Sequence, residues 1–303
     1  MRQENQPFKE RYTIQDLENL SGIKAHTLRI WEKRYGLLDP ARAGNNVRYY
    51  SQGDLKKLLN VAALYRHNYK ISGIASLSPK QLADAVRKET LQDFTDDFAV
   101  HALKLAMLTY NQPLFDQTFI QLLSRKPFGD IFRIVLLPLL NQIGLMWQTE
   151  TLTIAHEHFL SNLIRQKILL QIEQLQTAPF PESAKVFVLF LPVNEVHELG
   201  LMYSHYEILL RRHRSIYLGQ SVPIEALKDL QTVFPEITFV TAFTIQPSDE
   251  NLIEYLKKVS RSLLRKGKDE LWVSGRKIQS LSPKPKLEGI KYLPSPEAFL
   301  KAL

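Results

Sequence analysis

The chain has 303 residues, of which 45% are hydrophobic and 23% are charged, values ordinary for a globular protein of two or three domains. It has no cysteine, which excludes a disulfide framework, thiolate metal sites and a cysteine nucleophile. The net charge of +8 is uneven, because residues 1–80 hold 14 Lys and Arg against 7 Asp and Glu. A basic module joined to a nearly neutral body is typical of a DNA-binding domain with an effector domain.

The sequence also bears on where the protein resides. Its first residues are polar and charged, so we expect no signal peptide. No run of about eighteen apolar residues is evident, so we expect no membrane span. The protein is therefore expected in the cytoplasm, with no membrane partner.

Residues 11–50 predict two short helices, a turn between them and a basic hairpin, or wing. Thr13 can cap the first helix, with Asp16 three residues on as the reciprocal acid. The second helix spans about residues 24–34 and buries one apolar face. Its other face and the wing carry donors suited to phosphates and to purine edges in a DNA major groove. The candidate DNA contacts are His26, Thr27, Arg29, Lys33, Arg34, Arg42, Arg48 and Tyr49.

A further helix follows the wing, and Ser51 is placed to cap it. Lys56, Lys57 and Arg66 lie on this helix. They are either additional phosphate contacts or ordinary solvated charges, and the sequence favours neither alternative.

These residues resemble the MerR family of winged-helix regulators. The matching stretches are Tyr12–Ile14, Thr27–Leu37 and Val47–Ser51, followed by Asp54-Leu55. The resemblance implies a sequence-specific transcriptional regulator that binds double-stranded DNA. Because one small module gives too little specificity, we expect a homodimer or homotetramer on a palindromic site.

The remainder of the chain predicts two further domains. Residues 79–177 read as successive amphipathic helices with short connections, which indicates an antiparallel bundle. Pro138 should kink or divide the apolar stretch 128–148. After Pro179 and Pro181, short apolar strands alternate with helices, which predicts a parallel sheet covered on both faces.

The predicted fold class is therefore multidomain α and α/β: a winged helix-turn-helix over residues 1–78, a helical bundle over 79–177 and a flavodoxin-like parallel-sheet domain over 178–303. The expected strands are Val186–Leu191, Ser215–Leu218, Ile237–Phe243, Leu271–Val273 and Ile290–Tyr292. The expected helices between them are Leu199–Arg212, Ile224–Phe234 and Asp249–Leu264.

Two motifs stand out in the effector half. Trp147 is followed, after nine residues, by Glu157-His158. Glu157 lies on the apolar stripe of its helix, so it either has a buried partner or only complements the dipole of an exposed helix start.

The second motif runs from Glu195 to Gly200, directly after the first strand, where ligands bind in parallel sheets. A neutral His197 there either coordinates a metal, with Glu195 orienting its other ring nitrogen, or is a capping or solvated residue.

Together the two motifs resemble the cobalamin-binding half of the light-sensing MerR regulators. The resemblance implies a helical bundle over the upper face of a corrin and a lower axial histidine from the sheet domain. The residues that it assigns to the cofactor are Trp147, Glu157, His158, Glu195, His197, Gly200, Thr241 and Gly275, with His197 as the cobalt ligand. No zinc or other metal site is expected.

Three positions depart from that pattern. Cobalamin domains usually carry Ser-x-Leu after the third strand and Gly-Gly after the fourth, where this chain has Thr241-Ala242-Phe243 and Ser274-Gly275. Family members also have a histidine directly after the tryptophan, where this chain has Gln148. Glutamine is a poor cobalt ligand, so the resemblance does not extend to a light-triggered switch between two histidines.

Three functions stay open at this stage. The first is a regulator that senses a corrinoid, and the second is a corrinoid-carrying component of a methyltransferase, which would lack the N-terminal module. The third is a regulator whose cobalamin-like half has lost its cofactor and serves oligomerisation. We expect no enzyme activity, because no glycine-rich phosphate loop, nucleophile elbow or catalytic carboxylate pair is present in the sequence.

Overall fold

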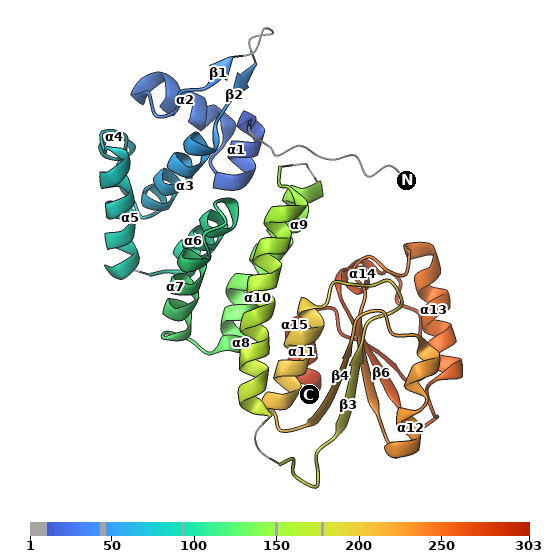
Figure 1. The fold of residues 1–303 in the computed structure, drawn as a ribbon. Helices are drawn as coiled ribbons and strands as arrows, with labels where there is room; N and C mark the ends of the chain where they lie inside the picture. Colours follow the sequence, from blue (N-terminus) through green and yellow to red (C-terminus); the bar gives the residue numbers. More distant parts are fainter. Residues whose placement is uncertain (1–10, 43–46, 93, 149–150, 177–178) are drawn as a thin grey trace. The chain divides into compact units, whose positions relative to one another are not determined.

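The computed structural model divides into two compact units, Met1–Leu163 and Ile164–Leu303 (Figure 1). The structure describes residues 11–42, 47–92, 94–148, 151–176 and 179–303.

The first unit begins with the predicted winged helix-turn-helix. Its elements are α1 (Ile14–Ser21), α2 (Ala25–Tyr35), β1 (Ala41–Arg42), β2 (Arg48–Tyr49), α3 (Gln52–Arg66) and α4 (Ile71–Ala75). Both predicted helix starts are confirmed, because Thr13 with Asp16, and Ser51 with Asp54, each form a reciprocal capping box. β1 and β2 pair antiparallel, with Arg42 opposite Arg48. The predicted apolar face of α2 is buried through Leu28 and Trp31.

The helical bundle follows in the same unit, as predicted. Its elements are α5 (Pro79–Gln92), α6 (Asp96–Leu108), α7 (Gln112–Leu123), α8 (Phe128–Ile131), η1 (Phe132–Leu136), α9 (Leu137–Gln148) and α10 (Ile154–Leu175), the last of which continues into the second unit. Short polar caps separate the helices, since Thr95 accepts a hydrogen bond from the Phe98 amide and Asn111 accepts one from the Leu114 amide.

Pro138 divides the apolar helix, as the sequence predicts. A π-helical turn, η1, ends at Leu136, and the amide of Leu137 donates to the carbonyl of Phe132 rather than to that of Arg133. The wider turn accommodates a proline that has no N–H and whose ring would clash with the carbonyl four residues earlier.

One expectation about this stretch needs correction. Phe128–Met146 is long and apolar enough, by length and composition, to cross a membrane. Its buried side chains, which include Ile131, Val135 and Leu139, nevertheless lie in the core of the first unit. The same length and composition occur in core helices, so this finding is weak evidence for a membrane span.

The second unit is the predicted doubly wound domain. Its strands are β3 (Val186–Phe190), β4 (Arg214–Gly219), β5 (Thr238–Ala242), β6 (Glu270–Ser274) and β7 (Ile290–Tyr292). They are parallel in the order β4-β3-β5-β6-β7, which is the flavodoxin-like order. All five predicted strands are therefore confirmed, with their ends shifted by a few residues.

Alternate side chains of these strands enter two separate cores. On one face Val188, Phe239 and Val273 pack with η2 (Ile224–Leu227), α13 (Asp249–Ser262) and α14 (Arg276–Ser280). On the other face Phe187, Val240 and Trp272 pack with α11 (Leu199–Leu210) and α15 (Pro296–Ala302), on the opposite side of the sheet in Figure 1. Because both faces are covered, the strands are nearly continuous apolar runs, which is why they were visible in the sequence.

The prediction of one continuous helix over Ile224–Phe234 is wrong. The structure has the 3-10 turn η2 and then a separate short helix, α12 (Leu230–Val233). Only η2 buries side chains, those of Ile224 and Leu227, whereas α12 has no buried residue. Without a continuous apolar stripe, packing does not stabilise one long helix here.

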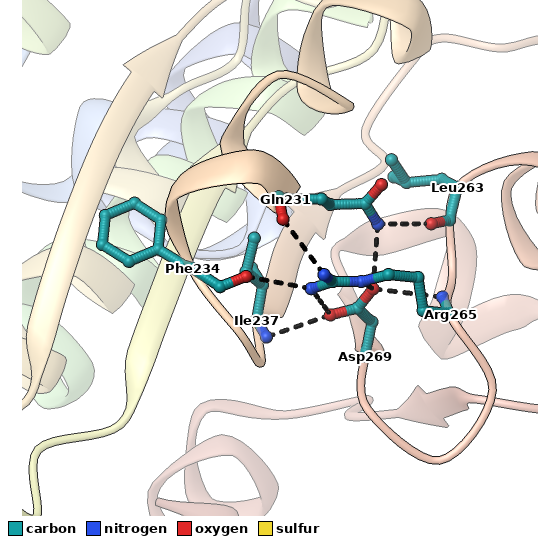
Figure 2. A network of polar contacts seen from close by, with 6 residues as sticks. All are labelled: Gln231, Phe234, Ile237, Leu263, Arg265 and Asp269. Carbon is teal, nitrogen blue, oxygen red and sulfur yellow. Dashed lines mark hydrogen bonds and ion pairs between the residues drawn. The ribbon is translucent and has the colours of Figure 1, made fainter.

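A polar network closes the sheet at the amino ends of β5 and β6 (Figure 2). The buried carboxylate of Asp269 accepts two side-chain hydrogen bonds from Arg265, at 2.7 and 2.8 Å, and one from Gln231 at 2.8 Å. It also accepts from the amide of Ile237 at 3.1 Å. This network lies at the edge opposite the one that binds ligands in such sheets, so its role is structural.

Candidate functional sites

The recognition helix, α2, presents the predicted polar face to solvent. His26, Arg29, Lys33 and Arg34 are exposed, while Thr27 is half-buried with its hydroxyl 3.3 Å from Nε2 of His26. The structure therefore brings five of the candidate DNA contacts onto one helix of a module that is otherwise well packed.

The start of α2 depends on a residue that the sequence did not single out. Lys24 at the N-cap makes no capping bond through its side chain. Instead the carboxylate of Glu18 accepts from the Ala25 amide at 2.9 Å and from the Lys24 ammonium at 3.0 Å. These two bonds lower the pKa of Glu18, and its negative charge complements the positive end of the helix dipole.

The wing is tied to the recognition helix by Glu32, whose role was also not predicted. Its carboxylate accepts from Nε of Arg48 at 2.9 Å and from the hydroxyl of Tyr50 at 3.0 Å. Burial, and then the bond to Glu32, raise the pKa of Tyr50, so its hydroxyl remains a donor. Of the other candidates in the wing, Arg42 is exposed and Tyr49 is half-buried.

The structure separates the three cations of α3 that the sequence left undecided. Lys56 is exposed and Lys57 is half-buried. Arg66 is exposed too, but it has a partner within the protein, because its Nη2 donates to the carbonyl of Ser21 at 2.8 Å. Unlike the two lysines, it therefore ties α3 to the end of α1.

The first cofactor motif lies at the end of α9 and the start of α10. The side chains of Trp147 and Gln148 lie outside the described residues. Glu157, in the first turn of α10, is half-buried and pairs with its neighbour, since Oε2 lies 2.6 Å from Nδ1 of His158. His158 is 63% exposed, so this pair lies on the surface of the first unit.

The second motif lies in the loop after β3 and is held by several hydrogen bonds to Glu195. Oε1 of Glu195 lies 2.6 Å from Nδ1 of His197, and it also accepts from the amides of Val196 and His197. Because Glu195 is ionised, this contact needs a proton on Nδ1, and an imidazole that ligates a metal through Nε2 carries its proton at that same atom. The predicted pairing of Glu195 with His197 is thus present.

Glu195 also reaches the next strand of the sheet. Its Oε2 accepts from three successive amides after β5, those of Thr244, Ile245 and Gln246, at 3.0, 2.7 and 2.9 Å. Burial by itself raises the pKa of this carboxyl, but the bonds from His197 and from the amides outweigh it and lower the pKa to about 2. Glu195 is therefore ionised at neutral pH although it is fully buried.

The remaining candidates lie at the same edge of the second unit. Two of them, Gly200 and Thr241, have surroundings that suit a ligand. Gly200 faces open space, with no atom within 4 Å of where a Cβ would lie, so a ligand can approach its backbone. The Thr241 hydroxyl is buried and has no hydrogen-bond partner among the described residues, so it could bond to a ligand.

The crevice beside Gly275, in contrast, is closed. A Cβ at Gly275 would lie 2.5 Å from the carbonyl oxygen of Phe243, and the amide of Phe243 donates to the carbonyl of Ser274 at 3.0 Å. The ring of Phe243 is fully buried against Tyr255. The loop after β3 therefore presents a histidine that a corrinoid could use, whereas the backbones at Phe243 and Gly275 leave no room between them for a ligand.

The geometry thus defines a DNA-binding regulator whose second half has the fold and the ligand edge of a corrinoid-binding domain. Residues 12–81 match the family described as MerR HTH family regulatory protein, and residues 99–170 match the family described as B12 binding domain. The HTH-type transcriptional repressor CarA of Myxococcus xanthus is 31% identical over 221 residues, which are 71% of this chain and 70% of CarA. The chain therefore belongs to the MerR family of helix-turn-helix regulators, in the group that also carries a B12 binding domain.

Two further similarities agree with this assignment. The HTH-type transcriptional repressor CarH of Myxococcus xanthus is 28% identical over 280 residues, which are 89% of this chain and 90% of CarH. The monomethylamine corrinoid protein of Methanosarcina barkeri superposes with a TM-score of 0.50 at 12% identity, over 71% of this chain and all of that protein. The structural similarity shows the fold alone.

Proposed function

We propose that this chain is a cytoplasmic transcriptional regulator whose affinity for DNA changes when a corrinoid binds to its second half. The observation that carries the proposal is the Glu195–His197 pair at the carboxyl end of β3, because it orients the imidazole through Nδ1 at the edge where doubly wound domains bind ligands. When bound, cobalamin would supply a cobalt ion that a histidine can coordinate.

Each of the candidate residues would have its own role in holding the corrinoid. His197 would coordinate the cobalt, held by Glu195, while Thr241 and Gly200 would border the corrinoid. Trp147, Glu157 and His158 would contribute to the opposite face. The proposed domain limits are 1–78, 79–177 and 178–303.

In the N-terminal module, α2 would enter the major groove and the wing would contact phosphate. The proposed contacts are His26, Thr27, Arg29, Lys33, Arg34, Arg42, Arg48 and Tyr49. A homodimer or homotetramer would supply a second copy of this module for the second half-site of a palindrome.

An absorbance spectrum of the full chain tests the proposal, after incubation with adenosylcobalamin and desalting, in the dark and then in light. We expect a retained corrin band that His197→Ala abolishes. His213→Ala, which changes a histidine at the opposite edge of the same sheet, is the matched control and should keep the band. A folded wild-type chain without a band would instead support a regulator that has lost its cofactor.

A further inference from the structure

The helix that follows the wing, α3, lies along α6, which leads into the region matched by the B12 binding domain. Nε2 of Gln52 donates to the carbonyl of Leu108 at 3.0 Å. At the other end, the rings of His67 and Phe98 meet edge to face at 5.1 Å. Because Gln52 begins α3 and Leu108 ends α6, the two helices run antiparallel and are joined at both ends.

Arg66, the last residue of α3, contacts two other helices at once. Its Nη2 donates to the carbonyl of Ser21, the last residue of α1, and its Nη1 contacts Nε2 of His101 on α6. Nη2 also lies against the turn after α1, since a Cβ on Gly22, the αL residue that ends this helix, would lie 2.5 Å from it. The guanidinium is therefore held from the DNA-binding side and from the bundle side.

Arg66 is exposed, whereas the residue of α6 that it contacts is buried. His101 and Lys104 on α6 are 5% and 7% exposed. Burial lowers the pKa of His101 to about 3, so its imidazole is neutral at pH 7 and Nε2 can accept from Arg66. Burial, and then the charge of Arg66, lower the pKa of Lys104 to about 8. Two cations held this close are retained only where specific contacts offset their repulsion.

We propose that Arg66 is a positioning residue that couples the helical bundle to the recognition helix. Only Gly22, Ile23 and Lys24 separate the Ser21 carbonyl from α2. A displacement of α6 that moves His101 acts on Arg66, and through the Ser21 carbonyl it changes the angle at which α2 leaves the turn. The coupling is a contiguous set of contacts, and it operates whether or not a corrinoid is the ligand that displaces the bundle.

The test measures DNA affinity of the full chain at several salt concentrations, on a fragment that the wild-type protein selects from a random-sequence library. Arg66→Gln and Arg66→Lys should each weaken binding by about 2- to 30-fold with an unchanged salt slope. Lysine keeps the charge but cannot bond to Ser21 and His101 together, so it should not restore binding. His101→Leu, which alters only the bundle side, should weaken binding in the same way.

Lys56→Gln is the matched control, because it removes one exposed cation from the same helix and should reduce the salt slope by about 1 if Lys56 contacts phosphate. All affinities are measured well below each melting temperature, where a role in stability alone leaves the affinity of the folded protein unchanged. Wild-type affinity in Arg66→Lys and His101→Leu would overturn the proposal, as would a slope reduced by about 1 in Arg66→Gln. If Arg66→Gln does not fold, the other two variants decide.

Discussion

Replacing Glu195 by glutamine should destabilise the second unit by about 3 kcal/mol at neutral pH. The carboxylate is fully buried, and its two oxygens face donors on both sides. Those donors are Nδ1 of His197 and the amides of Val196, His197, Thr244, Ile245 and Gln246. A carboxamide has one acceptor oxygen and turns its NH₂ group toward the donors on the other side, so part of this set loses its partner.

The magnitude follows from the pKa of Glu195. The hydrogen bonds hold it at about 2, against the ordinary 4.5, although burial alone would raise it. A difference of this size corresponds to about 3 kcal/mol. Because the pKa is lower in the folded state, this stabilisation is present above about pH 4.5 and is lost as the pH falls toward 2. The wild-type chain should therefore lose stability in that window, and Glu195→Gln should lose much less.

Native-state hydrogen exchange of the full chain at pH 7 measures the effect where it arises. Amides of β3 and β5 that exchange only on unfolding of the sheet should exchange about 100-fold faster in Glu195→Gln. Glu288→Gln makes the same chemical change at an exposed carboxylate paired with Lys266, and it should leave these amides unchanged. Wild-type protection in Glu195→Gln would show that the buried carboxylate adds little, and would refute the reasoning.

Three further changes have defined outcomes. Asp269→Ala should lower the free energy of unfolding of the second unit by about 3 kcal/mol in urea, because it leaves a guanidinium and several donors without their acceptor. Glu32→Gln should weaken binding to the selected DNA fragment about tenfold, since it loosens the link from the recognition helix to Arg48. Phe243→Leu combined with Ser274→Gly should favour adenosylcobalamin over cobinamide, which lacks the nucleotide tail, by about tenfold in the ratio of dissociation constants, because it opens the closed crevice.

The first of these changes has a matched control, and each of the three has a result that would contradict it. Asp249→Ala removes an 85% exposed partner of Lys277 and should hardly change the urea midpoint, so equal midpoints for Asp249→Ala and Asp269→Ala would contradict the role given to the network. Wild-type DNA affinity in Glu32→Gln would show that the wing holds its place without this carboxylate. A ratio of corrinoid affinities that does not change would mean that Phe243 does not close the crevice.

The parts of the fold that were predictable are those encoded over a few residues. The capping box of Thr13 and Asp16 spans three positions, and the strands are short continuous apolar runs. The site residues that were missed act over longer separations, because Glu32 reaches Arg48 and Arg66 reaches His101 only after folding. In the sequence, Arg66 resembles any other cation on α3.

Glu195, in the loop that carries His197, makes one contact that the sequence predicts and others that it does not. Its bond to Glu195 spans two positions and was predictable, whereas the three amides that hold the other carboxylate oxygen lie about fifty residues further along the chain. The strand order brings these amides close to Glu195, because β3 and β5 are neighbours in the sheet. Since β4 lies on the other side of β3, the strand order also reverses at this point, which is where doubly wound sheets bind ligands. It follows that the backbone after β5 helps to orient His197 through Glu195. A change in the loop Thr244–Gln246 that moves those amides should therefore change the orientation of the His197 ring through Glu195, which bonds to both.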